Sequence, residues 1–224
     1  MLSLFPRAHT APRLEEHYGL AQRPFAMTLD LHGNVTKEID FLGRLLANPA
    51  RPFVAVFGGA KVSSKITVLK NLMAKIDKLI IGGGMAYTFA AAKGGKVGKS
   101  LCEREFLSEA RDILAEAGRK GVRVFLPVDT KTVTGADMPG TLKTFPLDKI
   151  PDDREGVDIG PETVRQFAAA LSDAKTIFWN GPLGMFERPA FSEGTFSFAK
   201  AFAASTAVKV VGGGKLAGAG SGQL

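Results

Sequence analysis

Short apolar stretches rich in β-branched and aromatic residues alternate with longer helical patterns from about residue 52 to residue 212. The apolar stretches are FVAVF (53–57), KLIIG (78–82), VRVFLPV (122–128), TIFWN (176–180) and AVKVVG (207–212). Between them, the segments 62–76, 103–120, 161–174 and 193–205 carry apolar residues at spacings of three and four, which predicts helices. This alternation predicts a parallel sheet with helices on both faces, that is, a three-layer α/β/α Rossmann-like fold.

Each predicted strand is followed within a few residues by glycine, asparagine or aspartate. The segments concerned are GGAK, GGGM, PVD, NGPLG and GGGK. Because the carboxyl ends of parallel strands meet at one edge of a sheet, we expect these loops to form a single rim. Ligands of such sheets bind at that rim.

The loop after the first predicted strand, VFGGAKVSSK (56–65), carries Lys61 and Lys65 four residues apart. Glycines let a backbone approach a ligand closely, and two lysines one helical turn apart can reach the same anion. The helix is expected to begin at about Val62. Taken alone, this stretch is equally compatible with a phosphate cradle and with a tight strand-to-helix turn that carries two solvated lysines.

The other rim loops favour a ligand site. GGGM (82–85) leaves room for a flat ring against the backbone, GVDIGPE (156–162) adds glycine beside a helix that starts with Pro161, and WNGPLGMFE (179–187) places Asn180 and Glu187 on one loop. For Trp179 we expect packing in the core at the end of a strand. Two further glycine-rich stretches are not phosphate loops: GGKVGKS (94–100) follows a helical pattern, and GGGKLA (212–217) is not followed by a helix.

The net charge of +7 favours an anionic ligand, but no basic block or zinc-ligand spacing indicates nucleic acid. His9, His17 and His32 all precede residue 34, so the body of the chain offers no histidine for a catalytic triad or a metal cluster. A single cysteine, Cys102, fits a reducing compartment. No signal peptide or membrane span is recognisable, so we expect a cytoplasmic protein with no membrane partner.

Three regions are expected along the chain. Residues 1–33 form an irregular N-terminal segment, residues 34–214 form one domain, and residues 215–224 (KLAGAGSGQL) form a flexible tail. The domain is expected to open with a helix over 34–49.

Six motifs occur in the order and approximate spacing found in phosphoglycerate kinase: RPFVAVFGGAKVSSKI, KLIIGGGMAYTF, VGKSLCE, GVRVFLPVD, GVDIGPETV and WNGPLGMFE. From about Lys37 to Gly214 the sequence resembles the nucleotide-binding C-terminal domain of that two-domain enzyme. The resemblance implies reversible phosphoryl transfer between 1,3-bisphosphoglycerate and ADP, giving 3-phosphoglycerate and ATP in glycolysis. It also implies a monomer that uses ADP or ATP with Mg²⁺ and that binds 3-phosphoglycerate only if an N-terminal domain is supplied.

The resemblance also implies roles for individual residues. Lys61 would be the catalytic residue that stabilises the transferring phosphoryl group, Lys65 would bind a nucleotide phosphate, and Glu187 would accept hydrogen bonds from the ribose hydroxyls. The remaining contacts would come from Gly59 and Ala60 beside these lysines, from Gly82, Gly83 and Gly156 at the adenine ring, from Asn180, Pro182 and Met185 near the nucleotide, and from Gly213 and Gly214 after the last strand.

The sequence departs from the family pattern at both ends. The N-terminal domain, whose arginines and histidine grip the phosphoglycerate, is missing, and Arg7 is either a remnant of a substrate contact or part of a disordered terminus. After Gly214 the family has an aspartate that serves magnesium, whereas Lys215 stands here and cannot be an oxygen ligand. We therefore expect an incomplete domain without a protein ligand for the metal. Three alternatives stay open: a kinase-like chain that is not competent alone, a non-catalytic adenine-nucleotide-binding module, and an inactive fragment.

Overall fold

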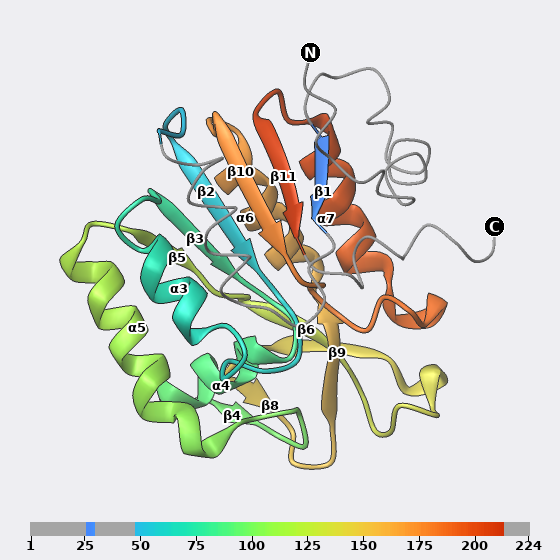
Figure 1. Ribbon diagram of the computed structural model, residues 1–224. Helices are drawn as coiled ribbons and strands as arrows, with labels where there is room; N and C mark the ends of the chain where they lie inside the picture. The colour runs from blue at the N-terminus through green and yellow to red at the C-terminus, as the bar shows by residue number, and fades with distance from the viewer. Residues whose placement is uncertain (1–25, 30–47, 213–224) are drawn as a thin grey trace.

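The structure is a computed structural model that describes residues 26–29 and 48–212, and its centre is a parallel sheet of six strands (Figure 1). The strands are β1 (Ala26–Leu29), β2 (Phe53–Phe57), β3 (Lys78–Ile81), β5 (Arg123–Phe125), β10 (Thr176–Asn180) and β11 (Val208–Gly212). They lie in the order β1-β11-β10-β2-β3-β5, and each neighbouring pair is parallel.

Five α-helices of the described chain cover the two faces of this sheet. Helices α3 (Ile66–Leu72), α4 (Met85–Ala92) and α5 (Leu107–Arg119) pack on one face, and α6 (Pro161–Leu171) and α7 (Glu193–Ala204) pack on the other (Figure 1). Short 3₁₀ turns occur at Arg104–Phe106 (η2), Pro139–Thr141 (η3) and Pro189–Phe191 (η4). The predicted three-layer α/β/α fold is therefore confirmed.

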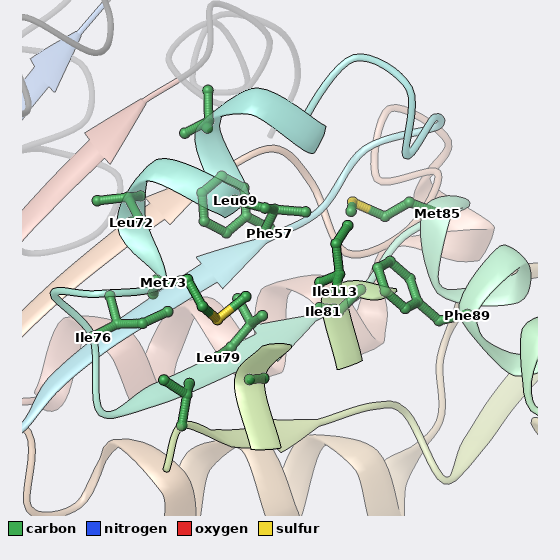
Figure 2. Packing of buried hydrophobic residues seen from close by; sticks show 14 of the residues in the cluster. Phe57, Leu69, Leu72, Met73, Ile76, Leu79, Ile81, Met85, Phe89 and Ile113 are labelled. Carbon is green, nitrogen blue, oxygen red and sulfur yellow. The ribbon is translucent and has the colours of Figure 1, made fainter. Parts of the chain in front are cut away.

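The central strand β2 is apolar at every position because both of its faces are buried. Phe53, Ala55 and Phe57 point toward α3, α4 and α5, whereas Val54 and Val56 point toward α6 and α7. Figure 2 shows the first of these two clusters, in which side chains of three helices pack over the sheet. Full burial of each large apolar side chain stabilises the fold by about 2 kcal/mol.

The helix expected from Val62 begins four residues later, at Ile66, and Lys65 is its N-cap residue. A turn at residues 63–65 precedes the helix, and the Ser64 hydroxyl donates to the Lys61 carbonyl over 2.9 Å. Serine side chains compete with the helical hydrogen-bond pattern in this way. Lys61 therefore lies on a loop and not on the helix.

The strand predicted over 122–128 is also shorter than expected, since β5 ends at Phe125. Pro127 has no N–H to donate to a strand ladder, which explains why the strand does not continue. The chain then turns into a part of the fold that the sequence pattern did not reveal.

Two small sheets were missed. Strands β6 (Asp129–Val133), β7 (Lys143–Pro146) and β9 (Glu155–Ile159) form an antiparallel sheet, and β4 (Lys96–Val97) pairs with β8 (Lys149–Ile150). In Figure 1 they lie beyond the end of the large sheet to which the arrowheads point. The GVDI stretch interpreted as a rim loop is thus a strand, although the helix expected to start with Pro161 does so.

The N-terminal prediction is only partly covered by the described residues. Strand β1 pairs with β11 inside the segment expected to be irregular, so an ordered strand replaces part of it. The helix expected over 34–49 falls on residues outside the described ranges up to residue 47, and the tail 215–224 lies outside them too.

Candidate nucleotide site at the carboxyl rim

Three loops that follow β2, β3 and β10 are joined by backbone hydrogen bonds at the rim. The Gly59 N–H donates to the Pro182 carbonyl over 2.7 Å, and the Met85 N–H donates to the Gly59 carbonyl over 3.0 Å. A third bond of 3.0 Å runs from the Gly83 N–H to the Leu183 carbonyl. Three of the five loops that the sequence placed at one rim therefore do meet and form one connected surface. The PVD segment instead leads into β6, and residues 213–215 of GGGK lie outside the described residues.

Glycine is required where these loops cross. A Cβ at Gly58 would lie 2.1 Å from the Pro182 carbonyl oxygen, and one at Gly83, which has a φ of +67°, would lie 2.6 Å from the Gly59 nitrogen. At Gly59 itself, where φ is +106°, no atom lies within 4 Å of the corresponding position. Close packing of backbone on backbone thus explains Gly58 and Gly83, whereas Gly59 presents an open face.

The phosphate side of the candidate site is defined by Lys65. Its ammonium donates a 2.5 Å hydrogen bond to Oδ1 of Asn180, a side chain that is 2% exposed at the end of β10. Asn180 is fixed in turn because its carbonyl accepts the Gly58 N–H over 2.8 Å. Lys61 is exposed on the same loop. Two cations, one of them oriented by a buried amide, therefore lie at the carboxyl end of the two central strands.

A buried carboxylate that the sequence reasoning missed holds the lysine loop. Oε1 of Glu103 accepts the Ser63 hydroxyl over 2.6 Å, and Oε2 accepts the Ser63 N–H over 3.1 Å. The Glu103 N–H donates to the Thr88 hydroxyl of α4 over 3.0 Å. The sequence offered only a weak signal for this residue, a glutamate at the end of the VGKSLCE motif.

Apolar side chains are also exposed beside the rim loops. Leu101 is 48% exposed and its Cδ2 is 3.1 Å from the Cβ position of Gly84, while Met185 is 37% exposed and its N–H donates to the Val157 carbonyl over 2.7 Å. Such exposed apolar side chains suit the faces of a flat ring. Leu101 was not predicted as a site residue, although its exposure makes it a candidate for the base pocket.

Two of the glycines assigned to the adenine pocket have a structural role as well. A Cβ at Gly156 would lie 1.9 Å from the Tyr87 hydroxyl oxygen, and one at Gly82 would lie 2.5 Å from a methyl carbon of Leu183. The Tyr87 hydroxyl is buried and 2.8 Å from the Thr130 hydroxyl, and burial raises the pKa of this phenol. The assignment of Gly82 and Gly156 to the nucleotide pocket stays a prediction.

Glu187 is exposed, two residues beyond Met185 on the loop that follows β10. Gly213, Gly214 and Lys215 lie outside the described residues, and the described chain ends at Gly212, the register partner of Asn180. The other expected neighbours, Ala60 and Pro182, are on the connected rim surface.

Two carboxylates of the small antiparallel sheet accept hydrogen bonds from the first turns of two helices. Asp129 accepts the Thr163 N–H of α6 over 2.8 Å, and Asp158 accepts the Gly194 N–H of α7 over 2.6 Å and the Thr195 hydroxyl over 2.8 Å. Helix N-termini attract anions, so protein carboxylates already satisfy these two. Helix α4 starts at the rim with no side-chain cap.

Several negative expectations can be compared with the described residues. Within 26–29 and 48–212, no group of three or more His, Cys, Asp or Glu side chains could hold a metal ion. No helix in those ranges is both long and apolar enough to cross a bilayer.

A cavity of about 900 Å³ lies away from the rim lysines. It lies between the end of α4 and the segments 126–128 and 147–152, and no predicted site residue lines it.

Two minor predictions are confirmed. Trp179 is 4% exposed and packs edge-on against Phe198 and Phe202, so it is a core residue. The GGKVGKS stretch follows helix α4 and not a strand, which agrees with its rejection as a phosphate loop.

A doubly covered parallel sheet with glycine-rich loops and lysines at its carboxyl rim defines a Rossmann-like α/β domain. Residues 25–221 match the family model described as phosphoglycerate kinase. The chain therefore belongs to the phosphoglycerate kinase family.

Individual relatives agree with this assignment. Phosphoglycerate kinase of Desulfosudis oleivorans is 53% identical over 178 residues, and that of Anaeromyxobacter sp. (strain K) is 52% identical over 187 residues. These alignments cover 80% and 83% of this chain but only 45% and 47% of the relatives.

Solved structures agree too. The structure of phosphoglycerate kinase from Coxiella burnetii matches with a TM-score of 0.77 and 44% identity, covering 82% of this chain and 47% of that one. The enzyme from Pyrococcus horikoshii OT3 matches with a TM-score of 0.67 and 29% identity, covering 81% of this chain and 46% of that one. The chain thus spans about half the length of the relatives it matches.

Proposed function

We propose that this chain binds ADP or ATP at the carboxyl rim and provides the nucleotide half of the phosphoglycerate kinase reaction. The observation that carries this proposal is the Lys65–Asn180 pair at the end of the two central strands, beside the exposed Lys61. Leu101 and Met185 offer exposed apolar contacts for the base. A site that combines cations with exposed apolar side chains suits an adenine nucleotide.

In the proposed reaction a phosphoryl group passes from the acyl phosphate of 1,3-bisphosphoglycerate to the terminal phosphate oxygen of ADP. Charge spreads over the equatorial oxygens during the transfer, so catalysis depends on positioning and on cations. Lys61 would stabilise that charge, and Lys65 would hold a phosphate of the nucleotide. The second substrate would bind to a separate domain, with 3-phosphoglycerate as the product.

Magnesium accompanies the nucleotide in this family. Within the described residues no group of three or more His, Cys, Asp or Glu side chains could hold a metal ion, and in the sequence Lys215 follows the glycine triplet where the family has an aspartate. An ammonium cannot replace an oxygen ligand of a hard cation. We therefore assign no step of the reaction to a protein-bound metal.

A second candidate function is nucleotide binding without chemistry. It requires only the nucleotide contacts of the rim, namely the Lys65–Asn180 pair and the exposed Leu101 and Met185. Mixing the chain with an isolated N-terminal domain of a relative distinguishes the two functions. Production of ATP from 1,3-bisphosphoglycerate and ADP only in the mixture supports the kinase half, whereas nucleotide binding without turnover supports the binding module. Absence of nucleotide binding by a folded chain would indicate an inactive fragment.

Lys65→Ala is expected to weaken ADP binding by about 10- to 100-fold, because hydrogen bonds to charged groups contribute roughly 1.5–3 kcal/mol. Isothermal titration with ADP measures the effect, and the shift in melting temperature with ADP should shrink accordingly. Lys70→Ala removes the same charge from an exposed position on α3 and serves as the control. Equal ADP affinity in the Lys65 variant and its control would rule out the phosphate assignment.

Glu187→Ala is expected to remove discrimination between ADP and 2′,3′-dideoxy-ADP. If the carboxylate accepts the ribose hydroxyls, the wild-type chain should bind ADP about tenfold more tightly than the dideoxy analogue. The variant should bind the two with equal affinity, and Glu105→Ala, another exposed glutamate, should keep the difference. A preference that survives in Glu187→Ala would contradict the role.

A further inference from the structure

The segment Ser100–Glu103, here called the connecting segment, touches both ends of the candidate site. It runs without helix or strand between β4 and η2, and its end residues are buried, with Ser100 7% and Glu103 8% exposed. Between them, Leu101 is exposed at the base side of the rim. The segment thus has two fixed ends and one exposed apolar side chain between them.

At one end, the Glu103 carboxylate grips the lysine loop. Both of its oxygens accept hydrogen bonds from Ser63, and its own backbone N–H is tied to Thr88, which is 1% exposed. Among the described residues Glu103 forms no ion pair with a lysine or arginine. The carboxylate of Glu103 is therefore hydrogen-bonded to Ser63, which is two positions from both Lys61 and Lys65 in the sequence.

At the other end, Ser100 holds the strand that borders the predicted adenine pocket. The Gly156 N–H donates to the Ser100 hydroxyl over 2.9 Å, and the neighbouring Lys99 N–H donates to the Arg154 carbonyl over 2.7 Å. Three residues of extended chain reach at most about 10 Å. The connecting segment therefore limits the distance between the phosphate side and the base side of the rim.

We propose that the connecting segment sets the relative position of the two halves of the nucleotide site, with Glu103 as a positioning residue for Lys61 and Lys65 and Ser100 as a positioning residue for the base side. This inference rests on the proposed nucleotide function. Removal of one acceptor oxygen at Glu103 displaces the lysines and leaves the base side in place. Removal of the Ser100 hydroxyl frees Gly156 and affects the base.

The test compares the affinities for ADP and for adenosine, which lacks phosphates, by isothermal titration of the whole chain. Glu103→Gln is expected to weaken ADP binding about tenfold with less than a twofold change for adenosine. Ser100→Ala is expected to weaken both ligands by a similar factor of about three to ten. Glu105→Gln and Ser108→Ala, which change exposed residues nearby, are matched controls that should change neither affinity.

Ser63→Ala is a milder second variant, because it keeps the Ser63 N–H bond to Glu103 and removes only the hydroxyl donor. It should shift the ratio of ADP to adenosine affinity in the same direction as Glu103→Gln. A purely structural role would lower the melting temperature without changing that ratio, and an unchanged ratio in both variants overturns the inference. If the wild-type chain binds neither ligand, the proposed function fails and the positioning roles fail with it.

Discussion

Gly58→Ala is expected to lower the free energy of unfolding by about 4 kcal/mol. The new methyl group would lie 2.1 Å from the Pro182 carbonyl oxygen and 2.6 Å from that of Gly181, both backbone atoms that cannot rotate away. Overpacking of this kind typically costs about 1–3 kcal/mol. Displacement of the loop would also break the bond from the Gly58 N–H to the Asn180 carbonyl, at about 1 kcal/mol. Urea unfolding followed by circular dichroism measures the loss.

The cause is steric and not conformational, since Gly58 does not have a positive φ. Gly118→Ala is the matched control, because Gly118 lies in α5, is exposed, and has no atom within 4 Å of its Cβ position. That substitution should raise stability by about 0.5–1 kcal/mol through helix propensity. A Gly58 variant as stable as the wild type would mean that the three rim loops are not packed as described.

The strands that the sequence predicted most accurately are those buried on both faces. The predicted bounds 53–57 and 176–180 agree with those of β2 and β10, because polar turns on both sides of a short apolar run mark where the strand starts and ends. The strand at 122–128 was too long because the apolar run LPV continues past Phe125 into a connection. Hydrophobicity alone did not show where the ladder ends.

The small sheets escaped prediction because more than half of their residues are polar. Strand β6 reads DTKTV, in which Thr130, Lys131 and Thr132 are all buried, so their burial depends on tertiary partners and not on hydrophobicity. Lys131 contacts Glu193 of α7, and Thr132 accepts a 2.7 Å hydrogen bond from the buried Arg154. Such pairs form between residues more than twenty positions apart, and a single sequence does not reveal them.

The candidate site, like the fold, was predicted only in part from the sequence. The meeting of the Lys65 loop with Asn180 followed from parallel topology, because the loop follows β2 and Asn180 is the last residue of the neighbouring strand β10. The contact of Glu103 with Ser63 spans 40 positions between two loops, which no periodicity reports. Residues that hold others in place were therefore missed, whereas residues at the ends of strands were found.

The second large expected effect concerns Asp158, which is 1% exposed and accepts hydrogen bonds from the first turn of α7. Burial raises the pKa of this carboxyl to about 6 from its ordinary value of 3.8, against the lowering effect of hydrogen bonds from Thr195 and Gly194. Between about pH 4 and pH 6 the folded chain therefore binds this proton and the unfolded chain does not. The contribution to stability is greatest below pH 4 and is lost as pH rises through 6.

Asp158→Asn is expected to remove this dependence. A shift of about two pKa units corresponds to about 3 kcal/mol, so the free energy of unfolding of the wild type relative to the variant should rise by about that amount between pH 7 and pH 4. Asparagine keeps an acceptor oxygen and is itself a favourable N-cap residue, so the variant should fold. Urea unfolding of both proteins at several pH values gives the difference.

The difference between the two proteins isolates Asp158 from carboxylates that act in the opposite sense. Hydrogen bonding to Arg51 lowers the pKa of Asp77, and the contact with Lys131 lowers that of Glu193. The stability that Asp77 and Glu193 contribute is lost as pH falls. Because both groups are present in both proteins, their contributions cancel in the comparison. Parallel stability curves for the two proteins from pH 4 to pH 7 would show that the N–H and hydroxyl donors at the start of α7 outweigh burial and that Asp158 stays ionised throughout this range.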